Sequence, residues 1–275
     1  MSVLIRLLSV SPLWLVHGLG WGLGWLVFFC SAGYRRNFVH NVRQAGQTWV
    51  HGCRAVGEAG KLVMELPRLW LGPPVRLQWS GRECLDHALA QGQGVVFLTP
   101  HLGCFEIAAQ AYVQVYGHQH APMTVLFRPP KKTWLREWVT LARTRQGLRT
   151  VPTNLAGVRQ LLRALKGGEC VGLLPDQVPP KGQGVWAPFF DQPAYTMTLS
   201  VRLAQQSGAT VLLAWGERLS WGRGYRVHVQ PLPEALPADL TQAVTLINRA
   251  MESLIRKCPQ QYLWAYARYK DPREG

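Results

Sequence analysis

Apolar positions in the second part of the chain alternate between short continuous runs and longer stretches with helical spacing. Four runs of about strand length end in turn residues and lie at residues 95–98, 124–127, 171–174 and 211–215. Apolar residues spaced three or four apart predict helices over residues 105–116, 134–145, 155–165, 199–206 and 240–257. Asn154 is a typical N-cap residue, and Gly208 is a typical helix stop. This alternation predicts an α/β fold with a central mixed sheet flanked by helices.

The beginning of the chain has a different pattern. Residues 7–30 are apolar except for Ser9, Ser11 and His17, and a helix of this length, about 24 residues, can span a hydrocarbon core of ~30 Å. We therefore expect residues 1–34 to be a transmembrane or membrane-anchoring helix. A cleaved signal peptide is the weaker alternative, because the apolar run is long and basic residues follow it. A helix lying in the membrane interface stays open, since four glycines and His17 weaken the apolar character.

Charge and glycine spacing add to this expectation. Arg6 precedes the apolar segment, whereas four arginines follow it, which predicts that the rest of the chain faces the cytoplasm. Gly18, Gly20, Gly22 and Gly24 recur at a spacing that allows close packing against another helix. Residues 35–74 are expected to form a basic helical membrane-proximal segment that is interrupted at Pro67 and at residues 73–74. Residues 75–275 then form the α/β domain.

The overall composition narrows the possible partners. The chain of 275 residues has 30 Lys and Arg against 15 Asp and Glu, a net charge of +15, so an anionic partner is expected. Every residue before Glu58 is uncharged or basic, which favours a membrane surface over nucleic acid, and we expect no nucleic-acid partner. The six cysteines form no C-x-x-C pair, which argues against a zinc ribbon or a disulfide framework. We expect no metal and no cofactor.

The candidate chemistry lies where the run at 95–98 ends. His101 and Glu106 follow this run, at the point where a strand meets a helix and where α/β sheets bind their ligands. On one continuous helix the two side chains would be about 140° apart, so a turn must lie between them. With His101 in the turn and Glu106 in the first helical turn, Glu106 is expected to accept the Nδ1 proton and leave Nε2 as a general base. A histidine and glutamate without a shared role are the alternative.

Three further features bear on this site. Asp176 follows another buried run and a proline, so its carboxylate is expected at the same edge of the sheet as His101, where it orients an arginine or the substrate. Cys104 lies within the His101 motif and is interpreted as a packing residue, because nothing in the sequence indicates a lowered thiol pKa. Four aromatic residues are candidates for the wall of an apolar tunnel or for ordinary core: Trp186, Phe189, Phe190 and Trp215.

The segment from His101 to Glu106 resembles the H-x4-D/E motif of the glycerolipid acyltransferases, and more narrowly that of the lipid A late acyltransferases. Other segments agree with the narrower family: residues 127–129 (FRP), 141–145 (LARTR), 168–177 (GECVGLLPDQ), 185–196 and 259–270. Three positions depart from the family pattern, with Cys104 for Asn, Phe105 for Trp and Asp191 for Gly. These departures leave the presumed catalytic groups in place.

The resemblance implies a function in which a fatty acyl chain moves from acyl carrier protein to a hydroxyl on a lipid A precursor, an anionic glycolipid. It implies His101 as the general base with Glu106, and we choose Arg128, Arg143 and Asp176 as residues that bind the acceptor. It also implies a bacterial inner-membrane location, with one span and the catalytic domain in the cytoplasm. The alternatives are transfer to a lysophospholipid or amino-acid lipid and, more remotely, a non-enzymatic basic membrane protein. Oligomeric state, acyl chain length and acceptor position stay open.

Overall fold

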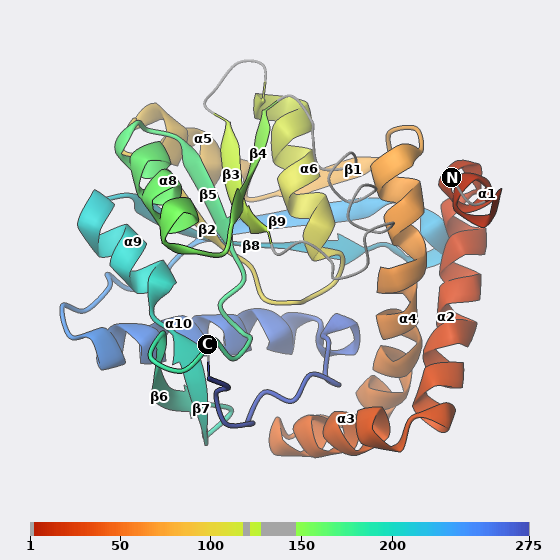
Figure 1. Ribbon diagram of the computed structural model, residues 1–275. Helices are drawn as coiled ribbons and strands as arrows, with labels where there is room; N and C mark the ends of the chain where they lie inside the picture. Colours follow the sequence, from red (N-terminus) through yellow and green to blue (C-terminus); the bar gives the residue numbers. More distant parts are fainter. Residues whose placement is uncertain (1–2, 118–121, 128–146, 275) are drawn as a thin grey trace.

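The computed structural model describes residues 3–117, 122–127 and 147–274, and the chain begins with a group of helices rather than one long helix (Figure 1). These are α1 (Val3–Val10), α2 (Leu13–Cys30), α3 (Ala32–Gln44) and α4 (Trp49–Leu71). The apolar segment predicted as a single helix is divided at Ser11 and Pro12, because proline has no N–H with which to continue α1. The remaining apolar helix, α2, has 18 residues and is about 27 Å long, slightly shorter than a ~30 Å hydrocarbon core.

Helix α4 continues through Pro67, so the predicted interruption at this residue is wrong. Proline removes one hydrogen bond inside a helix, but Glu65 and Leu69, on either side of it, are buried in the protein and hold this part of α4 in place. The helix ends at Leu71, and the Gly72 N–H donates to the carbonyl of Arg68 at 3.1 Å. The second predicted interruption, at residues 73–74, is therefore the actual end of the helix.

Helices α2 and α4 are in close contact through glycines. A Cβ atom added to Gly24 would lie 2.1 Å from the carbonyl oxygen of Val56, and one added to Gly60 would lie 2.0 Å from that of Gly20. Around Gly18 and Gly22 such an atom would meet nothing within 4 Å. The expectation that the glycines pack against another helix is therefore confirmed for Gly20 and Gly24, and the partner helix belongs to the same chain.

A seven-stranded mixed sheet forms the centre of the molecule, in the order β1-β9-β8-β2-β5-β3-β4. Its neighbouring strands run parallel except for the antiparallel pair β8 and β9. The strands are β1 (Leu77–Ser80), β2 (Val95–Leu98), β3 (Met123–Phe127), β4 (Leu148–Pro152), β5 (Cys170–Leu173), β8 (Thr210–Arg218) and β9 (Tyr225–Pro231). A separate antiparallel hairpin consists of β6 (Gly184–Phe189) and β7 (Gln192–Met197). The four predicted strands correspond to β2, β3, β5 and β8.

Helices cover both faces of this sheet, which confirms the predicted fold class (Figure 1). They are α5 (Arg82–Ala90), α6 (Phe105–Tyr116), α8 (Leu155–Lys166), α9 (Leu199–Ser207) and α10 (Leu240–Lys257), with short 3-10 turns η1 (Ser220–Gly222) and η2 (Pro259–Gln261). The Asn154 side chain caps α8 by accepting from Gly157 N–H at 3.0 Å, as predicted, and Gly208 ends α9 with φ of +72°. The helix predicted over residues 134–145 lies outside the described residues.

Alternate residues of β2 divide the interior into two hydrophobic clusters, as the period of a strand requires. Val95 and Phe97 pack with α5 and α6 on one face, whereas Val96 and Leu98 pack with α8, α9 and α10 on the other. Residues of α2, α3 and α4 belong to the same clusters, with Phe28 and Phe38 on the second face and Leu69 on the first. The domain boundaries expected at residues 34 and 74 stay predictions, but the helices before residue 75 share the core of the sheet.

Candidate active site

His101 lies in the tight connection between β2 and α6, at the carboxyl end of β2. The turn depends on Gly103, whose φ is +60° and where a Cβ atom would lie 2.0 Å from the carbonyl oxygen of Gly216. The loop is also bonded to the C-terminal part of the chain, since Gly103 N–H donates to the carbonyl of Gln261 at 2.9 Å. The predicted junction of strand, turn and helix is confirmed.

Asp176 is the partner of the His101 side chain. The Nδ1 atom of His101 is 2.7 Å from Oδ1 of Asp176, and the backbone N–H of His101 donates to Oδ2 at 2.8 Å. The Tyr262 hydroxyl donates to the same Oδ2 at 3.1 Å. Burial of Asp176, which is 1% exposed, raises the pKa of its carboxyl, but the imidazole and the hydrogen bonds from His101 outweigh burial and hold this pKa below its usual range.

This geometry corrects the expected role of Glu106 as the acceptor of the Nδ1 proton. Strands β2 and β5 are parallel neighbours with Leu98 opposite Leu173, so the residues three positions beyond each, His101 and Asp176, reach the same edge of the sheet. The spacing between His101 and Glu106 in the sequence does not indicate that β2 and β5 are neighbours, so it could not predict the contact with Asp176. Asp176 lies at the same edge of the sheet as His101, as expected. Its carboxylate orients His101, however, and not an arginine or the substrate.

The other ring nitrogen of His101 faces Gln177, and Nε2 is 3.0 Å from the side-chain nitrogen of Gln177. With Nδ1–H donated to the carboxylate of Asp176, Nε2 is left as the acceptor, and it accepts from the amide of Gln177. The ring of Phe105 packs edge-on against the imidazole, with the ring centres 4.9 Å apart. Sequence reasoning gave no role to Gln177 or Tyr262, although both belong to the segments that carry the family resemblance.

His101 and Glu106 both line one cavity, which has a volume of about 1030 Å³. Glu106 lies in the first turn of α6, and Gln177 and Arg202 also line the cavity. Among the described residues of its wall, Arg202 is the one Lys or Arg, and its Nε donates to the Thr198 hydroxyl at 3.3 Å. The candidates Arg128 and Arg143 lie outside the described residues. Within the described ranges, no group of three or more His, Cys, Asp or Glu side chains is arranged to hold a metal ion.

A buried ion pair lies behind the His101 loop. Arg218 of β8 donates from Nη2 to Glu65 of α4 at 2.6 Å and to the carbonyl of Gly103 at 2.9 Å. His17 of α2 and the Tyr225 hydroxyl contact the other oxygen of Glu65, at 3.1 and 2.8 Å. Burial raises the pKa of Glu65, but Arg218 and His17 outweigh burial and lower it to about 2. Arg218 is thus committed to the interior and is not available as a phosphate ligand.

Cys104 is fully buried beside this pair, and burial raises the pKa of its thiol well above the usual range. A thiol in this setting stays protonated and is a poor nucleophile. Its interpretation as a packing residue is confirmed.

The aromatic residues considered for an acyl tunnel do not line the cavity. Phe189, Phe190 and Trp215 are buried in the cluster on the face of α8, α9 and α10, and Trp186 is 47% exposed on β6. Aromatic composition identifies large side chains but not the direction in which they point.

Comparison with known proteins agrees with this fold and site. Residues 53–271 match the family model described as bacterial lipid A biosynthesis acyltransferase. The lipid A biosynthesis palmitoleoyltransferase of Escherichia coli is 30% identical over 237 residues, which are 84% of this chain and 74% of the relative. The lauroyltransferase of the same organism is 29% identical over 226 residues, 78% of this chain and 70% of the relative. The chain is therefore an acyltransferase and belongs to the bacterial lipid A biosynthesis acyltransferase family.

Proposed function

We propose that the enzyme transfers a fatty acyl chain from the thioester of acyl carrier protein to a hydroxyl of a hydroxyacyl chain on a lipid A precursor, with His101 as the general base. The observation that carries this proposal is the His101 ring, which is bonded to Asp176 through Nδ1 and lines the 1030 Å³ cavity. Family membership supports acyl transfer onto lipid A. The donor, the acceptor hydroxyl and the mechanism are proposals.

The transfer is a direct attack. The acceptor hydroxyl replaces the Gln177 amide as the partner of Nε2, and Nε2 takes its proton as the oxygen attacks the thioester carbon. A C–O bond forms and the C–S bond breaks. The proton then passes from the imidazolium to the departing thiolate, which restores neutral His101. Asp176 fixes the ring tautomer and stabilises the imidazolium through this sequence.

The oxyanion of the tetrahedral intermediate needs hydrogen-bond donors. The N–H groups of Leu102, Gly103 and Cys104 already donate to backbone carbonyls. The first N–H groups of a helix have no partner within the helix, so the N–H of Phe105 at the start of α6 is our candidate. The Glu106 carboxylate lines the cavity and is assigned to accept a hydrogen bond from the acceptor.

Anionic groups of the acceptor are expected at Arg202, and at Arg128 and Arg143, which we keep as candidates from the family resemblance. A guanidinium binds phosphate or carboxylate through paired hydrogen bonds. The net charge of +15 favours approach of both an acidic carrier protein and a phosphorylated glycolipid.

We also propose a location on the cytoplasmic face of the bacterial inner membrane. Among the described residues, α2 is the one helix long and apolar enough to cross a bilayer. However, it packs on the folded chain along its length, through Leu13 beside η1, His17 on Glu65, Gly24 on Val56 and Phe28 on Phe38. A helix held in this way fits the interfacial alternative better than a free single span.

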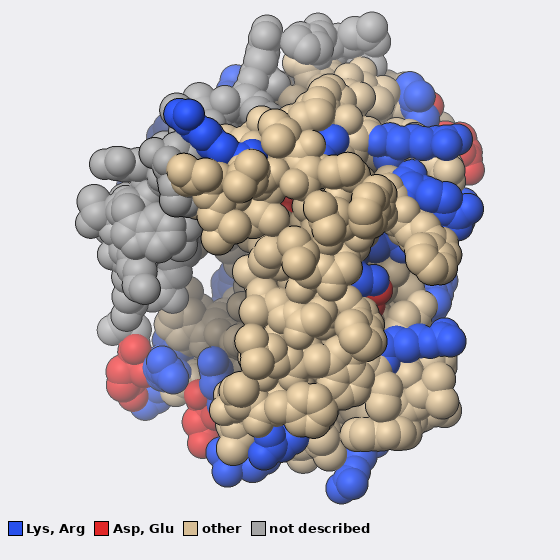
Figure 2. Space-filling model, turned by 90° about the vertical axis from the view of Figure 1, so that its right-hand side faces the viewer, with Lys and Arg blue, Asp and Glu red and all other residues tan. Residues whose placement is uncertain are grey.

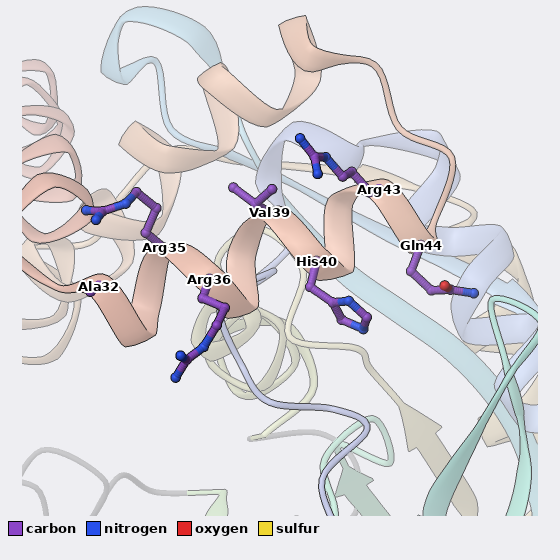
Figure 3. A pocket seen from close by; sticks show the side chains of 7 residues that line it. All are labelled: Ala32, Arg35, Arg36, Val39, His40, Arg43 and Gln44. Atoms are coloured by element: carbon purple, nitrogen blue, oxygen red, sulfur yellow. The ribbon is translucent and has the colours of Figure 1, made fainter.

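The surface around α2 has the properties that an interfacial helix needs. Figure 2 shows a broad band without charged side chains on this side of the molecule, with Lys and Arg along its edges. Large exposed apolar residues include Val3, Leu7, Trp14, Leu19, Phe29, Trp49, Val50 and Trp221. Next to α2, helix α3 presents Arg35, Arg36 and Arg43 around a surface hollow of about 780 Å³ (Figure 3). We assign this basic surface to anionic lipid head groups.

The test of the catalytic proposal is an assay of purified enzyme with acyl carrier protein thioester and either a lipid A precursor or a lysophospholipid. We expect transfer to the lipid A precursor, with a loss of about 10²-fold or more in kcat for both His101→Ala and Asp176→Asn. The variant Trp186→Ala, at an exposed position outside the cavity, is the control. Transfer to lysophospholipid alone would overturn the acceptor, and full activity of folded His101→Ala would overturn the mechanism.

A further inference from the structure

A narrower apolar slot adjoins the catalytic cavity, between α6 and the sheet. The slot has a volume of about 60 Å³ and shares Phe105, Ala109, Val125 and Leu174 with the wall of the larger cavity. Phe105 lies at the junction, in contact with the imidazole of His101. The slot therefore begins beside the reacting group.

The slot crosses several strands of the sheet. Its wall includes Gly172 of β5, Phe97 of β2, Ala214 of β8 and Val229 of β9, which are successive neighbours in the sheet. Three strand spacings correspond to about 14 Å. Beyond β9, the wall includes Trp79 of β1 and Leu85 of α5. Strand β1 is the edge strand on the far side of β9 from β5, so Trp79 marks the end of the slot away from the shared wall at Val125 and Leu174.

Small side chains leave the slot open. Ala108 and Ala109 of α6 lie over the sheet, and Ala214 of β8 lies in its floor. The wall carries few polar groups, and the hydroxyl of Tyr112 is already bonded to the thiol of Cys170 at 3.2 Å. Among the described residues of this wall there is no Lys, Arg, His, Asp or Glu, so a charged head group or a phosphate would find no ionic partner, whereas a hydrocarbon chain would be buried against apolar side chains.

We propose that this slot binds the methyl end of the donor acyl chain, and that Trp79 and Leu85 close it and set the length of chain that is transferred. This inference rests on the proposed function. The carbonyl of the donor must reach His101, so its chain starts at the junction with the slot. A chain that leaves a water-soluble carrier gains apolar burial in the slot, whereas an acceptor chain already surrounded by lipid gains none.

The test is a competition among carrier thioesters of different chain lengths, with the transferred chain identified by mass spectrometry of the lipid product. Ala108→Leu narrows the slot, so the ratio of long to short chains falls. Trp79→Ala extends the slot, so the ratio rises. A single methylene is worth about tenfold in discrimination, and we expect shifts of this size in opposite directions. Trp186→Ala, a tryptophan outside both cavities, keeps the wild-type ratio.

The outcomes separate this inference from the proposed function. If the wild-type enzyme transfers acyl chains to the lipid A precursor and both slot variants keep its chain-length ratio, the slot assignment is wrong while the function stands. A change in the preferred chain length of the acceptor, with the donor ratio unchanged, would also overturn the assignment. If the wild type transfers no chain to any lipid A precursor, the proposed function itself fails. Thermal unfolding of each variant checks that it is folded.

Discussion

Single residues decide which chemistry this site can perform. The Nδ1 atom of His101 is bonded to Asp176 and the Nε2 atom to Gln177, so the ring is held in one tautomer before any substrate arrives. The sequence identified His101 and the edge of the sheet on which Asp176 lies. It did not identify the bond between them, because that bond depends on β2 and β5 being neighbours, and 75 positions separate the two residues.

Asp191 is strained by its place in the β6–β7 turn. The two turn residues Phe190 and Asp191 have φ of +46° and +61°, the left-handed region that suits glycine. Asp191 is also the position at which the resemblance expects Gly. We predict that Asp191→Gly raises the free energy of unfolding by about 1 kcal/mol.

Chemical denaturation of the two proteins measures this difference directly. Asp239→Gly is a contrasting control, because the Asp239 side chain caps α10 by accepting from Gln242 N–H at 2.8 Å. Equal or lower stability of Asp191→Gly would contradict the assignment of strain to this turn.

At the scale of elements, local sequence patterns predicted only part of the packing of α2 on α4. The glycine spacing predicted a close helix contact, and it occurs at Gly20 and Gly24. The ion pair beneath the active site was not predicted, because Glu65 and Arg218 are 153 positions apart and no local pattern relates them. Short apolar runs located β2, β3, β5 and β8, whereas β1, β4 and β9 have no continuous apolar run of strand length and were missed.

Two glycines of α2 provide a matched pair of variants. Gly24→Ala places a methyl group 2.1 Å from the Val56 carbonyl oxygen, so the helices must separate, and we predict a loss of at least about 1 kcal/mol of stability. Gly22→Ala meets nothing within 4 Å and gains helix propensity of up to about 1 kcal/mol. Thermal unfolding in detergent compares the two, and equal effects would show that the contact at Gly24 contributes little.

The buried pair of Glu65 and Arg218 gives a pH dependence whose sign is set by the lowered pKa of Glu65. The carboxyl titrates near 4.3 in an unfolded chain and at about 2 in the protein. Its contribution is therefore complete above about pH 4.3 and is lost as the pH falls toward 2. We predict that Glu65→Gln is less stable than wild type at neutral pH, by up to about 3–5 kcal/mol, because Arg218 loses its paired carboxylate and keeps only the contact with Glu58 at 3.6 Å among the ion pairs described.

The same variant loses less stability between pH 4.3 and pH 2 than the wild type does. Unfolding midpoints of the two proteins at neutral pH give the loss of stability caused by Glu65→Gln. Midpoints between pH 4.3 and pH 2 give the acid sensitivity of each protein. Parallel curves for the two proteins would mean that Glu65 does not carry the acid sensitivity.

At the scale of the whole molecule, one side carries a broad uncharged surface bordered by Lys and Arg (Figure 2), and the cavity with His101 lies at the carboxyl ends of β2 and β5. We predict that the protein binds vesicles containing anionic phospholipid more tightly than neutral vesicles. Replacing Arg36 and Arg43 with Glu removes this preference but leaves the residual apolar binding. Vesicle flotation measures both, and a charge-reversed variant that keeps its preference for anionic vesicles would contradict the role of α3.

Labelling distinguishes a span from an interfacial helix. In a variant without its native cysteines, Val3→Cys reacts with an impermeant maleimide on intact spheroplasts only if α2 crosses the membrane. We expect labelling only after the cells are opened, because α2 is packed along the folded chain. Labelling of intact spheroplasts would restore the single span.

The contact between His17 and Glu65 has a practical consequence for preparing this enzyme. Removal of residues 1–30 is a common way to obtain a soluble fragment of an anchored protein. Here it would remove His17, which contacts Glu65, and would expose the glycines of α4 that pack on α2. Because Glu65 holds Arg218, and Arg218 holds the carbonyl of Gly103, the shortened fragment would lose support for the histidine loop together with the helix that we propose to contact lipid. Intact chain in detergent or nanodiscs is the appropriate material for kinetics.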